Sequence, residues 1–220
     1  MSIDEGVIKF DASQFVETAR LDDASIRQIN PIRCALYEKK LIGEYQDLNI
    51  GYGNISQRLR QPSQFSGVLS NIKHDSLQAQ FIISGTQTGH LETLTGHHYT
   101  CVTSVDLLGN TLQCQGPIMA SSESLTHGAI YLCHDTIDAV IHIHNKAIWQ
   151  GMLKDNLNHT PSHIPYGTFE MAQAVQRVIA RQSQGYLAMA GHEDGVIFYG
   201  QSLQAAFTLC MQMFERYIKP

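Results

Sequence analysis

A hairpin signal in the middle of the chain limits the fold more strongly than any other sequence feature. Residues 98–106 and 111–114 are strand-like, and the tripeptide Leu108-Gly109-Asn110 between them is typical of a tight turn. Two strands joined by so short a connection run antiparallel, since a parallel pair needs a crossover of a dozen residues or more. A purely parallel sheet is therefore excluded.

Strand-like and helical patterns alternate over most of the remaining chain. Short apolar or alternating runs predict strands at 54–59, 65–69, 81–83, 139–143, 186–190 and 196–199, with a polar loop at 71–80. Apolar residues at spacings of three and four predict helices at 22–42, 121–134, 169–182 and 202–217. We expect one α/β domain at residues 21–220, whose mixed or antiparallel central sheet is covered by helices on both faces. Residues 1–20 show little periodicity and are expected to form a loose N-terminal arm.

Composition excludes several classes of protein. Hydrophobic residues make up 43% of the 220 residues, enough for a sizeable core. A net charge of -5 argues against non-specific nucleic-acid binding, which needs a clustered basic surface. No apolar run reaches the roughly 18 residues of a membrane span, and the first residues lack a signal core. Five scattered cysteines without a CxxC pair indicate reduced thiols. We therefore expect a cytoplasmic protein with no membrane or nucleic-acid partner.

The histidines are the most informative polar residues. The chain has eleven of them against fifteen lysines and arginines, and two stand in the strand-like run Val140-Ile141-His142-Ile143-His144. Alternate side chains of a strand point to the same face, so His142 and His144 project together, about 7 Å apart along the strand. Two imidazoles placed in this way can share a divalent metal ion. Two solvated histidines on an edge strand would produce the same pattern.

Further candidate residues flank this pair. Glu123 lies nineteen residues before His142, at the start of a predicted helix, where an acid is also favoured by the helix dipole alone. His127 is one turn further on and is more simply explained as a histidine packed under the helix. His192, in Gly191-His192-Glu193-Asp194-Gly195, lies between two predicted strands and on its own would be a loop histidine.

Taken in order, these motifs resemble the class II aldolase and adducin head-domain family. The resemblance covers roughly residues 25–215, and each motif is weak alone while the ordered set is specific. It rests on Ser121-Ser122-Glu123, His127, the His142-x-His144 pair and a later loop histidine, together with Gly53-Asn54-Ile55-Ser56, Ile83-Ser84-Gly85-Thr86, Pro165-Tyr166-Gly167-Thr168 and the run 199–206.

The resemblance implies a three-layer α/β/α fold and a role for each matching residue. His142, His144 and His192 would be metal ligands and Glu123 the catalytic acid or base. The phosphate-binding residues would be Asn54, Ser84, Gly85, Ser121 and Ser122. Three protein ligands leave a coordination position open for substrate, and zinc is the expected ion, although such a site also suits manganese, iron or cobalt. Independently of the resemblance, two serines before a helix favour an anion at its N-terminus.

The sequence departs from the family pattern at three places. The 29 residues between Asn54 and Ser84 form a longer stretch than the compact aldolases have. Two acids separate His192 from Gly195, so either His192 ligates from an extended loop, which we favour, or Glu193 or Asp194 has joined the site. Residues 151–165 lack the tyrosine that protonates the leaving group in the sugar-phosphate aldolases. His159 and His163 lie in this segment and could substitute, whereas Tyr166 belongs to another motif.

The expected function is that of a metal-dependent lyase that cleaves a C–C bond through a metal-stabilised enediolate. Its substrate would be a phosphorylated sugar or a similar small hydroxy-ketone. A ketose-phosphate dehydratase or epimerase, similar to methylthioribulose-phosphate dehydratase, is the alternative, because it uses the same ligands and glutamate. A non-catalytic adducin-like interaction domain and a metal-binding regulator stay open as well. The family also implies a homo-oligomer, commonly a tetramer. The specific substrate, the native metal and the pathway are not determined by the sequence.

Overall fold

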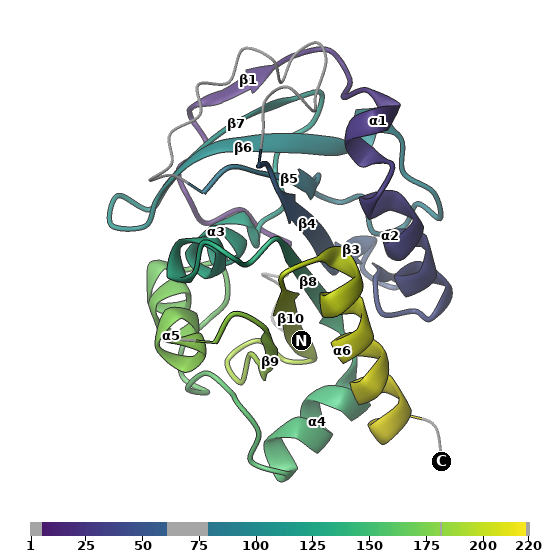
Figure 1. Cartoon of the computed structure of the whole chain (residues 1–220), viewed down its shortest axis with the longest axis vertical. Helices are drawn as coiled ribbons and strands as arrows, with labels where there is room; N and C mark the ends of the chain where they lie inside the picture. The colour runs from purple at the N-terminus through teal and green to yellow at the C-terminus, as the bar shows by residue number, and fades with distance from the viewer. Residues whose placement is uncertain (1–5, 61–78, 181, 219–220) are drawn as a thin grey trace.

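The computed structural model describes residues 6–60, 79–180 and 182–218. Within them, eight strands form one sheet in the order β1-β7-β6-β5-β4-β8-β10-β9 (Figure 1). The strands are β1 (Phe15–Glu17), β4 (Asn54–Arg58), β5 (Phe81–Ser84), β6 (Tyr99–Asp106), β7 (Thr111–Gly116), β8 (Ala139–His144), β9 (Gly185–Ala188) and β10 (Gly195–Gly200). Neighbours pair antiparallel except β1 and β7, which are parallel, so the predicted mixed sheet is confirmed.

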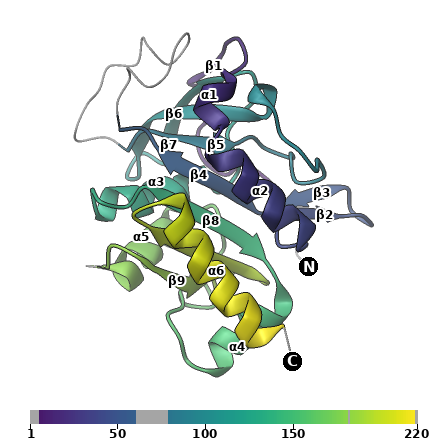
Figure 2. The same ribbon diagram turned by 45° about the vertical axis from the view of Figure 1, so that its right-hand side comes forward.

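Helices cover both faces of this sheet, as expected. They are α1 (Asp23–Ile26), α2 (Ile29–Glu38), α3 (Ser124–Cys133), α4 (Lys146–Lys154), α5 (Phe169–Ile179) and α6 (Leu203–Tyr217). Helices α2, α4 and α6 pack into one hydrophobic core, and α3 and α5 into a second core on the other side (Figures 1 and 2). No helix among these residues is long and apolar enough to span a membrane.

Strand β8 runs between the two cores, which explains its sequence. Ile141 and Ile143 belong to the core under α2, α4 and α6, whereas Val140 belongs to the core under α3 and α5. Because side chains alternate along a strand, His142 and His144 share the face of Val140. The sequence prediction that the two histidines project together is therefore confirmed, but they lie on a buried central strand instead of a solvated edge.

Side-chain caps mark where four of the helices begin. Asp22 caps α1 by accepting a hydrogen bond from the Ser25 amide. The Asn145 side chain accepts a hydrogen bond from the Ile148 amide, so α4 starts directly after His144. Thr168 and Ser202 cap α5 and α6 in the same way. Such caps typically stabilise a helix by about 1 kcal/mol. The Asn145 cap directly follows His144, the last residue of the strand that carries the two histidines.

The N-terminal part of the chain differs most from expectation. The helix expected at 22–42 is two helices, and α2 begins two residues before Pro31, because proline has no amide hydrogen to donate and is tolerated only in a first turn. A hairpin of β2 (Gly43–Tyr45) and β3 (Ile50–Tyr52) and the helix α4 were not predicted. The strand expected at 65–69 and most of the polar loop at 71–80 lie outside the described residues.

The expectation of a loose arm is wrong for residues 10–17. Phe10 is buried in the core under α3 and α5, and β1 pairs with β7 at the edge of the sheet. The apolar side chain of Phe10 and the backbone hydrogen bonds of β1 attach this segment, although its sequence shows no periodicity. The division of the chain at residue 20 stays a prediction.

Candidate metal centre and active-site pocket

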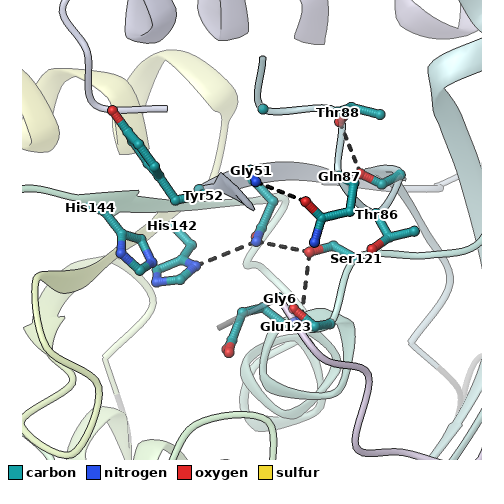
Figure 3. A pocket seen from close by; sticks show the side chains of 15 residues that line it. Gly6, Gly51, Tyr52, Thr86, Gln87, Thr88, Ser121, Glu123, His142 and His144 are labelled. Carbon is teal, nitrogen blue, oxygen red and sulfur yellow. Dashed lines mark hydrogen bonds between the residues drawn. The ribbon is translucent and has the colours of Figure 1, made fainter. Parts of the chain in front are cut away.

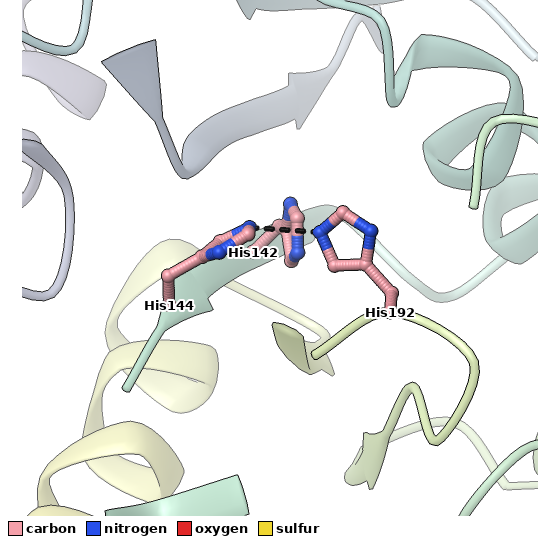
Figure 4. Close-up of side chains that lie close together, drawn as sticks. All are labelled: His142, His144 and His192. Carbon is pink, nitrogen blue, oxygen red and sulfur yellow. Dashed lines mark hydrogen bonds between the residues drawn. The ribbon is translucent and has the colours of Figure 1, made fainter. Parts of the chain in front are cut away.

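Three histidines from two segments of the chain meet at one end of the sheet. His142 and His144 come from β8, and His192 comes from the turn between β9 and β10, which pairs with β8. The Nε2 atoms of His144 and His192 are 2.9 Å apart, and one ring nitrogen of each histidine lies within 4.8 Å of the other two (Figure 4). The structure thus brings together the three residues that the sequence predicted as metal ligands.

The three imidazoles are buried and neutral. Burial lowers the pKa of His142 to about 3. Burial, and secondarily the neighbouring histidines, also hold the pKa values of His144 and His192 well below their usual range. A neutral imidazole keeps a nitrogen lone pair for a metal ion, whereas a protonated ring has none. The site is therefore ready to bind a cation without first losing protons near neutral pH.

Two further observations test whether these residues fit a metal ion. The Nε2 atom of His142 is buried and has no hydrogen-bond partner among the described residues. Gly195 lies against the cluster, and a Cβ atom there would come within 2.2 Å of His192 Cδ2 and 3.2 Å of His142 Nε2. The cluster thus depends on a residue without a side chain at position 195. Three converging nitrogen donors, one of them unsatisfied, fit a divalent ion with a coordination position left for substrate.

The two acids after His192 do not join the cluster. Glu193 forms an exposed ion pair with Lys146, at 2.9 Å, and Asp194 adopts a left-handed backbone conformation with φ of 67°. The Gly195 amide donates to the His192 carbonyl at 3.0 Å and closes the turn. The potential metal-binding cluster in the described part of the chain contains no carboxylate. The geometry therefore supports His192 over Glu193 or Asp194 as the third ligand.

Glu123 lies in the same pocket as the histidines. It occupies the N-cap position of α3, one residue before the helix begins. The sequence had predicted a position in the first turn of the helix. Its side chain does not cap the helix and is only 2% exposed. The pocket it lines is also lined by His142 and His144 (Figure 3). The start of a helix thus places a carboxyl group in the pocket that the histidines line.

Most of the residues predicted to bind phosphate line this pocket. Asn54, Gly85, Ser121 and Ser122 do so, and the Asn54 amide donates to Ser121 Oγ at 3.0 Å. The same amide lies 3.4 Å from His142 Nδ1, so it connects Ser121 to the histidine cluster. A Cβ atom at Gly85 would lie 2.5 Å from Ile118 Cγ2, so packing also requires a glycine there.

Ser84 and the remaining candidate histidines lie elsewhere. The Ser84 hydroxyl accepts from the Ile55 amide at 3.2 Å and joins β5 to β4, and Ser84 is not among the residues that line the pocket. His127 lies on the buried face of α3, as expected for a packed histidine, and its Nδ1 atom is 2.7 Å from Ser56 Oγ. His159 and His163 are exposed and do not line the pocket. The geometry does not support a site role for Ser84, His159 or His163.

Three residues that lie near the histidine cluster were not identified from the sequence. Tyr45 of the β2–β3 hairpin places its hydroxyl 2.9 Å from His144 Nδ1. The Tyr166 ring packs edge-on against His192, with ring centroids 4.4 Å apart, and the Lys9 ammonium lies 3.9 Å from the Tyr166 centroid. Tyr166 had been attributed to another motif. Tyr45 and Lys9 carry no sequence signal, since neither stands in a recognisable pattern.

Comparisons with known proteins bear on the family and on the fold. The family model described as "Class II Aldolase and Adducin N-terminal domain" matches residues 39–218. No curated protein sequence matches the chain. Among solved structures, an L-fuculose 1-phosphate aldolase is 18% identical with a TM-score of 0.61, over 90% of this chain and 84% of that chain.

Two bacterial structures are similarly related. The L-fuculose-1-phosphate aldolase of Thermus thermophilus is 17% identical with a TM-score of 0.57, over 88% of this chain and 91% of that chain. The sugar-phosphate aldolase of Thermotoga maritima is 16% identical with a TM-score of 0.60, over 86% of this chain and 90% of that chain. At such identities the structural likeness establishes the fold alone, and the family model covers most of the sequence. The chain belongs to the class II aldolase and adducin N-terminal domain family.

Proposed function

We propose that this protein is a metal-dependent lyase that cleaves a C–C bond in a phosphorylated sugar or a similar small hydroxy-ketone. One observation carries the proposal: three buried, neutral imidazoles converge beside a buried glutamate, in a pocket lined with amide and hydroxyl donors. His142, His144 and His192 would hold one divalent ion, with zinc as the first candidate. When bound, such an ion supplies Lewis acidity, which stabilises negative charge on substrate oxygens as the bond next to a carbonyl breaks.

Glu123 is the proposed proton carrier. Its side chain lines the same pocket as His142 and His144, so it would be within reach of a substrate bound there. It would take a proton from the substrate and return it to the product, as general acid–base catalysis requires. The backbone at the start of α3 fixes its position, which limits the motion needed for the transfer.

Asn54, Gly85, Ser121 and Ser122 are the proposed phosphate-binding residues. They supply a side-chain amide, two hydroxyls and backbone next to the N-terminus of α3, where the positive end of the helix dipole favours an anion. The related solved structures include proteins named for fuculose 1-phosphate and sugar phosphates, which supports this substrate class. Ser84, which does not line the pocket, would act by joining β4 to β5.

A dehydratase or epimerase acting on a ketose phosphate is the second candidate. Residues 151–165 contain no tyrosine, and no residue of that segment lines the pocket. The tyrosine that the resemblance implies as the acid for C–C cleavage therefore has no counterpart in this segment, which favours these alternatives. The same ligands and pocket would serve all three reactions.

Two broader features complete the proposal. All five cysteines are free, and three of them are buried, which suits a reducing compartment such as the cytoplasm. The homotetramer implied by the family stays a prediction. Size-exclusion chromatography with light scattering would measure the mass of the assembly, and hence the number of subunits.

The test measures metal content first and then turnover. Untagged protein purified without chelator is analysed for bound metals, loaded with Zn²⁺, and incubated with a panel of ketose phosphates. We expect release of a triose phosphate and an aldehyde, and release that is slower by about 10²-fold or more from Glu123→Gln. Loss of water or inversion at a carbon, without cleavage, would replace the lyase by a dehydratase or an epimerase. Protein that takes up no metal would contradict the proposal and favour a non-catalytic interaction domain.

A further inference from the structure

We propose that Tyr45 is a positioning residue for the metal centre, and that its hydroxyl selects the nitrogen atom of His144 that binds the ion. In this arrangement His144 donates from Nδ1–H to the Tyr45 hydroxyl oxygen, and its Nε2 lone pair faces the cluster. The inference rests on the proposed function, since it takes the three histidines as ligands of a divalent ion. It adds a residue from a hairpin that no sequence motif indicated.

The distances on the two sides of the His144 ring carry the proposal. Nδ1 lies 2.9 Å from the Tyr45 hydroxyl, and Nε2 lies 2.9 Å from His192 Nε2. A neutral imidazole has one N–H, so a hydrogen-bond acceptor at Nδ1 leaves Nε2 with the lone pair. Metal-binding histidines commonly have an acceptor on the second nitrogen, which fixes the ring orientation and strengthens the ligand. Tyr45 occupies that position.

The backbone around Tyr45 holds its hydroxyl in place. Tyr45 ends β2 and pairs with Ile50 of β3, and the Leu48 amide donates to the Tyr45 carbonyl at 2.9 Å, closing the turn. The Gly51 amide donates to Gln87 Oε1 at 2.8 Å, which attaches the hairpin to the pocket-lining loop that carries Gln87 (Figure 3). The hairpin is thus attached to the pocket wall and is not a free surface loop.

A backbone contact fixes the distance between the hairpin and the histidine strand. The His144 amide donates to the Leu41 carbonyl at 3.0 Å, two residues before β2 begins. The His144 backbone and its ring are therefore both connected to the same short segment of chain. Changes at Tyr45 are expected to affect His144 more than the other two histidines, whose neighbours are Asn54 and Tyr166.

Tyr52 provides a matched control from the same hairpin. Its ring centroid lies 5.6 Å from that of His144, compared with 6.1 Å for Tyr45, and the two tyrosine rings pack 4.6 Å apart. Its hydroxyl, however, donates to the Lys40 carbonyl at 3.3 Å. Replacing either tyrosine by phenylalanine keeps the ring packing and removes one hydroxyl. Only the change at Tyr45 removes the hydrogen bond to His144.

The experiment compares the metal affinity of wild type, Tyr45→Phe and Tyr52→Phe. Each metal-free protein is titrated with Zn²⁺ in competition with a chromophoric chelator, and its thermal unfolding is recorded to show that it folds. We expect Tyr45→Phe to bind Zn²⁺ about 10- to 100-fold more weakly, the usual effect of losing a hydrogen-bond partner of a metal ligand. Tyr52→Phe is expected to keep the wild-type affinity.

A spectroscopic measurement separates positioning from packing. With Co²⁺ in place of Zn²⁺, the visible absorption bands report ligand geometry, and we expect them to change in Tyr45→Phe and not in Tyr52→Phe. Unchanged Zn²⁺ affinity and Co²⁺ bands in Tyr45→Phe would overturn the inference while leaving the proposed function intact. Equal losses in the two variants would show that hairpin packing is responsible, and would overturn it too. A wild-type protein that binds neither ion would contradict the proposed function itself.

Discussion

His144 and His192 are 48 residues apart in the chain, yet their Nε2 atoms lie 2.9 Å from each other. Only one of these two nitrogens can donate a proton to the other, and burial disfavours the extra charge of a second proton. With His142 Nε2 nearby and unsatisfied, the arrangement brings together three imidazole nitrogens that can bind a metal ion. This convergence of imidazole nitrogens is what makes the cluster suitable for a metal ion.

Replacing a ligand should abolish metal binding without unfolding the protein. In His142→Ala or His144→Ala, two nitrogen donors are left, fewer than the three that catalytic zinc sites use. We expect both variants to lose bound zinc after dialysis and to keep the wild-type circular dichroism spectrum. His163→Ala, at an exposed histidine outside the pocket, is the control and should retain the metal. Full metal occupancy in the two β8 variants would remove these histidines from the site.

Changing Glu123 should affect the reaction and not the metal. Glu123→Gln keeps the size of the side chain and removes its ability to accept a proton. We expect unchanged zinc content and a rate that is lower by about 10²-fold or more, the lower end of the usual range for a general acid–base residue. The measurement is kcat on the substrate found by the ketose-phosphate panel. Near-normal turnover would show that another group transfers the proton.

Phosphate binding can be tested without knowing the substrate. Inorganic phosphate at ten times its dissociation constant should stabilise the metal-free protein by about 1.4 kcal/mol, and raise its melting temperature by roughly 3–5 °C. Working without metal separates the phosphate pocket from direct binding to the ion. Ser121→Ala is expected to reduce this shift, and Ser162→Ala, at an exposed loop position, to preserve it. An absent shift at millimolar phosphate would leave the pocket without support.

Arg33 should be among the most important residues for stability. Arg33 is 1% exposed, and its guanidinium donates to the carbonyls of Thr88, Gly89, Leu91 and Glu92 in the loop beside the pocket. Arg33→Met would leave these acceptors without their charged donor and should cost about 3 kcal/mol or more, measured by urea denaturation. The exposed Arg27→Met is the matched control. Equal stability of the two variants would contradict this role.

His127 should make the stability depend on pH. Burial, and secondarily His142, holds the pKa of His127 well below its usual 6.5, so only the unfolded chain protonates it as the pH falls below about 6.5. Its stabilising contribution is therefore complete above pH 6.5 and is lost as the pH decreases. Below that value the unfolding free energy of wild type should fall by about 1.4 kcal/mol per pH unit more than that of His127→Asn. Urea titrations of the metal-free proteins between pH 7.5 and 5 measure this difference, and identical slopes would refute it.

Much of the fold was predictable because its signals are local. The turn at 108–110, with Asn110 at a φ of 50°, connects β6 and β7 as expected, and strands β4, β5, β8, β9 and β10 lie close to their predicted ranges. Helix α4 and the β2–β3 hairpin were missed for the same reason. The helix is nine residues long and the strands three each, too short for periodicity to be distinctive.

The sequence by itself determined that His142 and His144 share a face, because strand geometry alone fixes the direction of alternate side chains. The ordered motifs also indicated the family and named His192 and Glu123 as candidates. Only the tertiary structure decided that the three imidazoles meet in a buried cluster, that Glu193 pairs with Lys146, and that Ser84 joins two strands instead of lining the pocket. It alone revealed Tyr45, which is 99 residues from His144. Such contacts depend on how distant segments pack, whereas periodicity depends on neighbouring residues.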